Sequence, residues 1–376
     1  RNGTTNTDRT NFFEDVPTSA LERTLYLEAD RMGFLAGNLS AEMLERERGV
    51  VQNEKRQGEN QPYGRNFDRM VETMYPYSHP YSWSTIGSMA DLNAATLDDI
   101  KDWYASWYGP NNAVLALAGD ISVDEAKRLV GKYFGGIAPG QPIAKLKAWV
   151  PTLDADIREH MEDRVPQTRI LRAWHIPQAG TRELHALELY AGLLAGSDSS
   201  PLDKRLVFSQ QLATSVAAFA WGQELSGLLI VQADVKPGVD PATVEREIDA
   251  VIAETLAKPL GSAELERART RYLADFARGI ERLGGFGGRA DILAEHLTQF
   301  DCADAYLDRL KDLNAIDAGE VQRVATQWLG RHHYTLTVAP FANLKAAKND
   351  LDRTHLPALG TPPDVRFPDV QRATLA

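Results

Sequence analysis

The sequence predicts an α+β fold arranged as two similar domains. Strand-like and helix-like segments occur on both sides of a proline- and glycine-rich stretch at residues 139–152, which is typical of a linker. The chain has 376 residues, enough for two hydrophobic cores. Residues 100–117 also align without a gap on residues 321–338, and each run reads as a helix ending in tryptophan, a turn and a strand. The predicted division is a first domain at residues 1–138, the linker at 139–152, a second domain at 153–342 and a proline-rich tail or connector at 343–376.

In the first domain, residues 2–13 are rich in threonine and end in two phenylalanines, which predicts a strand. Apolar residues at helical spacing predict a helix that begins near Thr18 or Ser19 and a second that begins at the N-cap Ser40. The apolar run at residues 113–118 predicts a buried strand. Further helices are predicted at residues 67–75, from the cap Thr96 to Tyr108, and at 123–134.

The second domain shows the same mixture of patterns. Apolar or alternating runs predict strands at residues 157–161, 168–174, 213–221, 228–235 and 334–338. Helical spacing predicts helices at residues 182–194, 241–256, 262–283, 287–299 and 317–329. Both domains therefore combine strands with helices, as the α+β class requires.

Composition excludes several classes of protein. A net charge of −11 and a pI of about 5.3 argue against nucleic-acid binding, which needs a basic surface. No long uncharged apolar run is present, so we expect a soluble globular chain without a membrane span. The single cysteine, Cys302, excludes a disulfide framework and is expected to be a small buried residue. The chain begins with Arg1 rather than Met, so we expect its natural start and any targeting signal upstream, and a bacterial periplasm and a cytoplasm both remain open.

The predicted helix after Ser40 carries two glutamates, Glu47 and Glu54, seven residues apart. Two helical turns separate them, so both carboxylates project from roughly the same face. Val50 and Val51 lie between them and are expected to point partly toward an apolar neighbour. A carboxylate beside an apolar stripe is either neutralised by a partner or used for chemistry. Periodicity alone favours the simpler interpretation, a solvated helix with interleaved glutamate and arginine.

Four segments in chain order resemble one known family. They are Asn2-Gly-Thr-Thr-Asn-Thr-Asp-Arg-Thr10, Leu27-Glu-Ala-Asp-Arg-Met32, Glu47-Arg-Gly-Val-Val-Gln-Asn-Glu54 and Tyr108-Gly-Pro-Asn-Asn-Ala-Val-Leu-Ala-Leu-Ala-Gly-Asp120. Together they are similar to the pitrilysin/insulysin clan of inverted-motif zinc peptidases, which includes mitochondrial processing peptidase. The resemblance implies two similar α/β-sandwich domains, each an antiparallel-rich sheet with helices packed on it, that form one half of a clamshell metallopeptidase.

In that family, zinc is bound by the two histidines of an HxxEH helix and by a distal glutamate. By position in the motif, the resemblance implies that Glu54 is the metal ligand and that Glu47 supports the opposing histidine helix. A carboxylate is an acceptable third ligand when the fourth position stays open for water. None of the eight histidines forms an HxxEH motif. We therefore expect the two histidine ligands of the Zn²⁺ to lie outside this sequence, and the chain alone to be inactive.

A second departure from the family concerns the oxyanion. Many members carry an arginine and, seven residues later, a tyrosine that hold the substrate carbonyl. The corresponding run here is Leu206-Val-Phe-Ser-Gln-Gln-Leu-Ala-Thr-Ser-Val216, so Val207 and Thr214 occupy those two positions. Neither side chain can donate as a guanidinium or a phenol does. The resemblance therefore implies a partner half or subunit of the same fold that supplies the arginine and the tyrosine.

The resemblance also implies a substrate class. Peptides or unfolded segments would enter a closed chamber and bind in extended form along an edge strand, by β-augmentation. Asn2 and Thr4 on the opening strand are the nearest contacts of this kind.

Other interpretations remain open. One is a non-catalytic structural or partner subunit of the same family, like the core proteins of respiratory complexes. A nucleotide-binding protein rests only on the glycines of residues 284–288, which lie between predicted helices and so favour a turn. His332 and His333 form a candidate metal pair and His79 is a candidate cleft residue, for which solvent exposure and core packing are the favoured interpretations.

Overall fold

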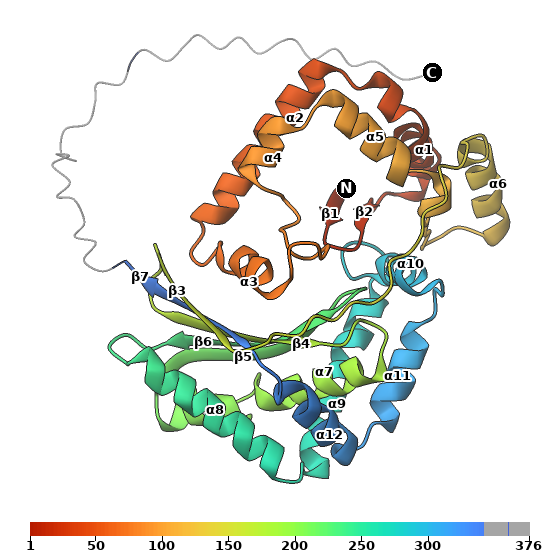
Figure 1. Ribbon diagram of the computed structural model, residues 1–376. Coiled ribbons are helices and arrows are strands. Elements are labelled where there is room, and N and C mark those ends of the chain that lie inside the picture. The colour runs from red at the N-terminus through yellow and green to blue at the C-terminus, as the bar shows by residue number, and fades with distance from the viewer. Residues whose placement is uncertain (342–359, 361–376) are drawn as a thin grey trace. The chain divides into compact units, whose positions relative to one another are not determined.

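The computed structural model describes residues 1–341 and residue 360 (Figure 1). Apart from residue 360, the predicted tail at residues 343–376 lies outside the described residues. None of the helices in the described part of the chain combines the length and the apolarity that crossing a bilayer requires.

A five-stranded sheet forms the centre of the second half of the chain. Its strand order is β3-β7-β4-β6-β5, and every neighbouring pair is antiparallel except β3 with β7. All five strands were predicted from the sequence. Their bounds are β3 Ile157–Asp163, β4 Arg169–Ile176, β5 Ala213–Gly222, β6 Gly227–Val235 and β7 Tyr334–Pro340.

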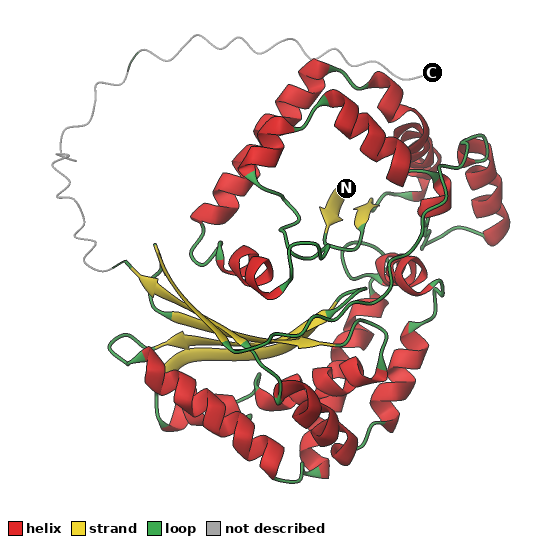
Figure 2. Cartoon of the chain, viewed as in Figure 1, coloured by secondary structure: helices red, strands yellow, loops and turns green. Residues whose placement is uncertain are grey.

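Strands β4 and β6 are buried along nearly their whole length and are rich in apolar residues because both faces of the sheet are covered. One face, which includes Ile170 and Val231, packs against a layer of helices (Figure 2). The other face, which includes Leu171 and Ile230, packs against Met70 of a helix from the first half of the chain. The helices of the layer include α7 (Arg182–Leu194), α8 (Pro241–Ala257), α9 (Ser262–Glu281) and α12 (Ala318–Leu329), and the helix on the opposite face is α3 (Asn66–Met74).

The first half of the chain consists mainly of helices. Some of their N-termini follow the expected capping rule, and the hydroxyl of Ser40 accepts a hydrogen bond from the Met43 amide at 3.2 Å. Thr96 forms a full capping box with Asp99. Besides α3, the helices are α1 (Leu21–Asn38), α2 (Ala41–Asn60), α4 (Met89–Ala94), α5 (Leu97–Trp107) and α6 (Val123–Phe134).

Residues 2–13 form a hairpin of two strands, so the prediction of one continuous strand was wrong. The strands are β1 (Asn2–Thr5) and β2 (Thr10–Phe13). The side-chain oxygen of Asn6 accepts hydrogen bonds from the amides of Asp8 and Arg9, both at 2.9 Å. An asparagine that bonds the backbone two residues later closes a turn, and this overrides the strand propensity of the threonines.

The buried strand predicted at residues 113–118 is also absent. These residues form no strand ladder with any other described segment, and Leu115 is exposed. The aligned run at the end of the chain becomes β7 because β3 and β4 flank it on both sides. An apolar run is therefore not sufficient for a strand, since its backbone groups also need partners.

Further features differ from the sequence-based expectations. The helices α4 and α11 (Tyr306–Ala315) and a π-helical turn, η3 (Asp203–Ser209), were not predicted. Cys302 is exposed rather than buried, and its thiol donates to the Asp304 carboxylate at 2.9 Å. The predicted α+β class is confirmed, and the division into two domains stays a prediction.

Arg172 of β4 is the largest side chain that the core buries completely. Its guanidinium contacts the Thr335 hydroxyl at 3.2 Å, Glu245 of α8 at 3.3 Å and the Asp249 carboxylate. Burial lowers the pKa of Arg172 to about 10, which still leaves the guanidinium charged at neutral pH. The sheet and α8 are therefore joined by a buried ionic contact.

We expect Arg172→Ala to lower the free energy of unfolding by about 3–5 kcal/mol, because Glu245, Asp249 and the Thr335 hydroxyl would all lose their shared buried partner. The matched control is Arg158→Ala, since Arg158 contacts the same Glu245 but is 58% exposed. An exposed pair contributes up to about 1 kcal/mol, so the control should change stability little. Urea denaturation measures both variants, and equal losses would contradict the role given to Arg172.

Candidate metal centre on helix α2

One side of α2 packs against α4. The Arg48 guanidinium donates to the Leu92 carbonyl and, at 2.7 Å, to the Ala95 carbonyl. The Gln52 amide donates to the Asn93 side-chain oxygen at 2.7 Å. These contacts fix the rotation of α2 about its axis and thereby decide which of its residues face outward.

The predicted residues Glu47 and Glu54 lie on the outward side. With Val50 they follow the i, i+3, i+7 spacing of a single helical face, and all three are exposed. Glu47 accepts a hydrogen bond from Arg46 at 3.3 Å, whereas the Glu54 carboxylate has no hydrogen bond or ion pair with a described residue. Val50 is 46% exposed, so the apolar neighbour expected beside it is not found among the described residues.

The described residues do not form a zinc site by themselves. Among them, no three histidine, cysteine, aspartate or glutamate side chains lie close enough together to bind one metal ion. Glu54 supplies one unengaged carboxylate, which suits a single ligand position. A complete tetrahedral site needs additional ligands, and no catalytic step through a metal follows from this chain alone.

Asn2 and Thr4, the predicted substrate contacts, both lie on β1. The Asn2 side chain accepts a hydrogen bond from the Gly3 amide at 2.9 Å. The Thr4 hydroxyl donates to Asn11 and accepts from Arg9, both at 2.6 Å, and so belongs to the internal network of the hairpin. A role of either residue in substrate binding stays a prediction.

Val207 and Thr214 lie close to each other in sequence but in different elements. Val207 is half-buried in η3, and Thr214 is exposed at a bulge in β5. The Thr214 hydroxyl accepts from the Gln167 amide at 2.7 Å. Arg205, the nearest arginine, is bound by Glu247 and Glu254, each at 2.9 Å. These positions therefore present no free guanidinium or phenol.

The structure agrees with the favoured interpretations of His79 and His332 but not with that of His333. His79 is fully buried between aromatic rings, with centroid distances of 4.6 Å to both Tyr75 and Trp149. His332 is exposed and bonds Asp156 at 3.0 Å, whereas His333 is half-buried against the Trp174 ring. Core packing explains His79, and solvent exposure explains His332 only.

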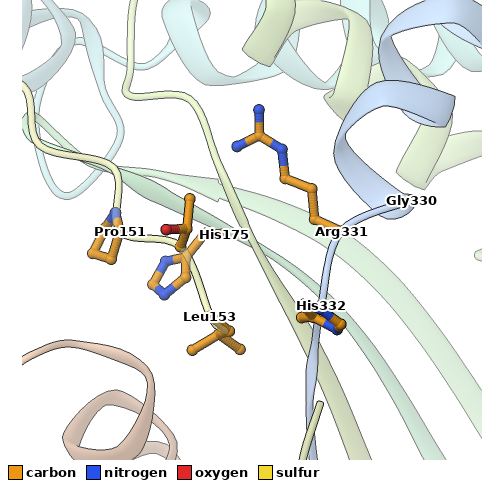
Figure 3. Close-up of a pocket in the computed structure, with 7 residues that line it drawn as sticks. Pro151, Leu153, His175, Gly330, Arg331 and His332 are labelled. Atoms are coloured by element: carbon orange, nitrogen blue, oxygen red, sulfur yellow. The ribbon is translucent and has the colours of Figure 1, made fainter. Parts of the chain in front are cut away.

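His175 was not singled out from the sequence. It is 4% exposed in β4 and lines a small pocket together with Arg331 and His332 (Figure 3). Its Nε2 lies 2.9 Å from the Met74 carbonyl, and burial lowers the pKa of His175 to about 4. The sequence feature that could have identified His175 is a polar residue within the otherwise apolar end of β4. His175 is therefore neutral at pH 7, and its Nε2–H links β4 to α3.

The fold now defines the structural class of the protein. It is an α+β fold in which a mixed five-stranded sheet is covered by helices on both faces. Comparison with known proteins supports this class. Residues 94–272 match the family model described as the Peptidase M16 inactive domain.

Related proteins point to one family. The chain is similar to zinc proteases of the M16, or pitrilysin, family. It is 28% identical over 335 residues to zinc protease PqqE of Helicobacter pylori, across 87% of this chain and 73% of that protein. It also resembles the crystal structure of a protease from Helicobacter pylori, with 26% identity, a TM-score of 0.81 and coverage of 90% of this chain and 82% of that one.

A further solved structure is similar in fold. The M16 inactive domain from Pseudomonas fluorescens matches with 20% identity and a TM-score of 0.73, over 86% of this chain and 76% of that chain. The stretch that matches the family model begins at residue 94, after α2 has ended. The roles of Glu47 and Glu54 therefore stay predictions.

The site geometry makes a prediction about metal binding. We expect the 376-residue chain to bind no stoichiometric Zn²⁺ through Glu54, because its described residues supply a single ligand there. Calorimetric titration with Zn²⁺, repeated on Glu54→Gln, measures this. Equimolar zinc that is lost in the Glu54→Gln variant would show that the chain completes the site itself.

Proposed function

We propose that this chain is the glutamate-bearing half of a zinc-dependent endopeptidase that cleaves peptides or unfolded segments in a closed chamber. The observation that carries the proposal is the unengaged Glu54 carboxylate, seven residues after Glu47 on the outward face of α2. Several other charged side chains of α2 have a partner, as Glu45 does with Arg48 at 3.1 Å, whereas Glu54 has none among the described residues. A carboxylate without one stays available to a cation.

The helix gives Glu54 a defined position. Arg48 and Gln52 anchor the opposite side of α2, so the Glu54 backbone cannot rotate freely. In the complete enzyme, Glu54 would be one zinc ligand, and two histidines from outside these 376 residues would be the others. Glu47, about 10 Å along the helix, would orient the histidine-bearing element through a hydrogen bond. The bound zinc would activate a water molecule for attack on the peptide carbonyl.

The oxyanion donors would come from a complementary half of the same fold. Val207 and Thr214 offer no strong donor, and the neighbouring Arg205 is held by two carboxylates. Loss of one oxyanion donor costs roughly 3–4 kcal/mol of transition-state stabilisation. A half that retains a metal ligand without such donors is therefore expected to work with a partner that carries the arginine and the tyrosine.

Substrate would bind in extended form along β1. This strand pairs with β2 on one side only among the described residues, so its other edge has free backbone groups. An edge of this kind can accept a peptide strand through main-chain hydrogen bonds. Asn2 and Thr4 would then position the substrate.

The second candidate function is a non-catalytic partner subunit of the same family. The observation that favours it is the pair Val207 and Thr214 in place of donors, together with a match to the family model named for the inactive domain. The two functions differ in one respect. A catalytic half needs Glu54 for metal binding, whereas a structural half tolerates its loss.

The test is Glu54→Gln in the complete protein, assembled with its partner half. We expect zinc content and peptidase turnover both to be lost while the circular dichroism spectrum and the melting temperature stay unchanged. Glu47→Gln should reduce zinc affinity or turnover by about 10–100-fold, since it acts without touching the metal.

Glu45→Gln is the matched control, because Glu45 is exposed on the same helix but faces away from Glu54. Its zinc content and turnover should equal those of the unchanged protein. If Glu54→Gln retained full zinc and full turnover, Glu54 would not be the ligand. If the unchanged protein bound no zinc and cleaved no peptide, the non-catalytic function would be favoured.

A further inference from the structure

A second pocket lies among the helices that cover the sheet, separate from α2. It is bounded by the end of α7, the end of α8, the first turns of α9 and the loop of residues 197–201. Its volume is about 420 Å³, within the range of small-molecule sites. The size and position of this pocket distinguish it from the smaller pocket beside His175.

The inner wall of the pocket presents apolar groups. Leu193, Leu194 and Leu260 line it, together with Ala268. The polar atoms at this depth already have partners, because the Tyr190 hydroxyl lies 2.8 Å from the Thr255 hydroxyl, which donates to the Ile252 carbonyl at 2.9 Å. A ligand would therefore place an apolar group against this wall.

At the rim of the pocket, two positively charged side chains have no acidic partner among the described residues. Glu254 is held by Arg205 at 2.9 Å, and Glu264 accepts the Gly261 amide at 3.1 Å as part of a helix cap. Lys258 and Arg267 line the same pocket, and their side chains have no hydrogen bond or ion pair with a described residue. In a chain whose net charge is −11, this rim carries locally free positive charge.

A third cation holds the loop that closes the pocket. The Arg271 guanidinium donates to the Gly196 carbonyl at 2.6 Å. Gly196 has a φ of +106°, and a Cβ atom there would lie 2.3 Å from the Arg271 guanidinium. The positive φ favours glycine at this position, and a Cβ atom would displace the Arg271 guanidinium. The Ser197 and Ser200 hydroxyls, 2.9 Å apart, follow directly and add hydrogen-bonding groups to the rim.

We infer that this pocket binds a small apolar carboxylate, with its chain against Leu193, Leu194 and Leu260 and its carboxylate at Lys258 and Arg267. A guanidinium and an ammonium that line the same pocket can both bind a carboxylate, and a small inorganic anion would leave the apolar wall without contacts. The same chemistry is present in a fatty acid and in the C-terminal leucine of a peptide. The inference requires neither zinc nor peptidase activity, so its test is independent of the proposed function.

The experiment is calorimetric titration of the full 376-residue protein with two probes, octanoate and N-acetyl-leucine. We expect saturable one-to-one binding of at least one probe, and which probe binds more tightly identifies the source. The double variant Lys258→Gln, Arg267→Gln should bind at least tenfold more weakly. Octanol, which keeps the chain but lacks the charge, should also bind at least tenfold more weakly than octanoate.

Two further variants keep the result interpretable. Ala268→Phe fills the pocket without removing a charge and should abolish binding, while Arg278→Gln removes an exposed charge from the same helix outside the pocket and should leave binding unchanged. The inference is overturned if neither probe binds saturably, or if the double variant or Ala268→Phe binds as the unchanged protein does.

Discussion

The burial of strand β4 on both faces is the constraint on which the rest of the structure depends. Its consecutive residues Ile170 and Leu171 point to opposite faces and enter two separate cores, one under the helix layer and one under α3. A strand with both faces apolar needs a cover on each side. Because α3 belongs to the first half of the chain, the second half alone would leave one sheet face open to water. The buried His175, whose ring bonds the Met74 carbonyl, reinforces the same contact.

This constraint also fixes the surroundings of the candidate site. The hairpin turn is tied to the second half, because the Tyr81 hydroxyl donates to the Asp8 carboxylate and accepts the Leu225 amide at 3.0 Å. Burial raises the pKa of Asp8, as expected for a carboxyl removed from water. With the hairpin and α3 held in this way, α2 is left to pack through Arg48 and Gln52, and its opposite face remains exposed with Glu47 and Glu54.

Signals within a short stretch of sequence predicted most of the helices and strands. The errors in strand prediction arose because a strand also needs pairing with distant segments. Capping by Ser40 and Thr96 and the period of the apolar residues located α2 and α5, because these signals lie within one helix. The runs at residues 113–118 and 334–338 look alike in sequence, yet only the second has strands on both sides. The turn at Asn6 could have been read from its residue type, since asparagine often closes turns. The sequence alone shows the spacing of Glu47 and Glu54, whereas the exposure of Val50 depends on tertiary packing.

The central claim is that Glu54 binds zinc together with ligands from outside this sequence. Anomalous diffraction at the zinc absorption edge, on crystals of the complete protein assembled with its partner half, tests it most directly. We predict one anomalous peak at about 2.0–2.2 Å from a Glu54 carboxylate oxygen and at about 2.0–2.1 Å from two histidine nitrogens. A zinc peak whose ligands do not include Glu54 would contradict the claim.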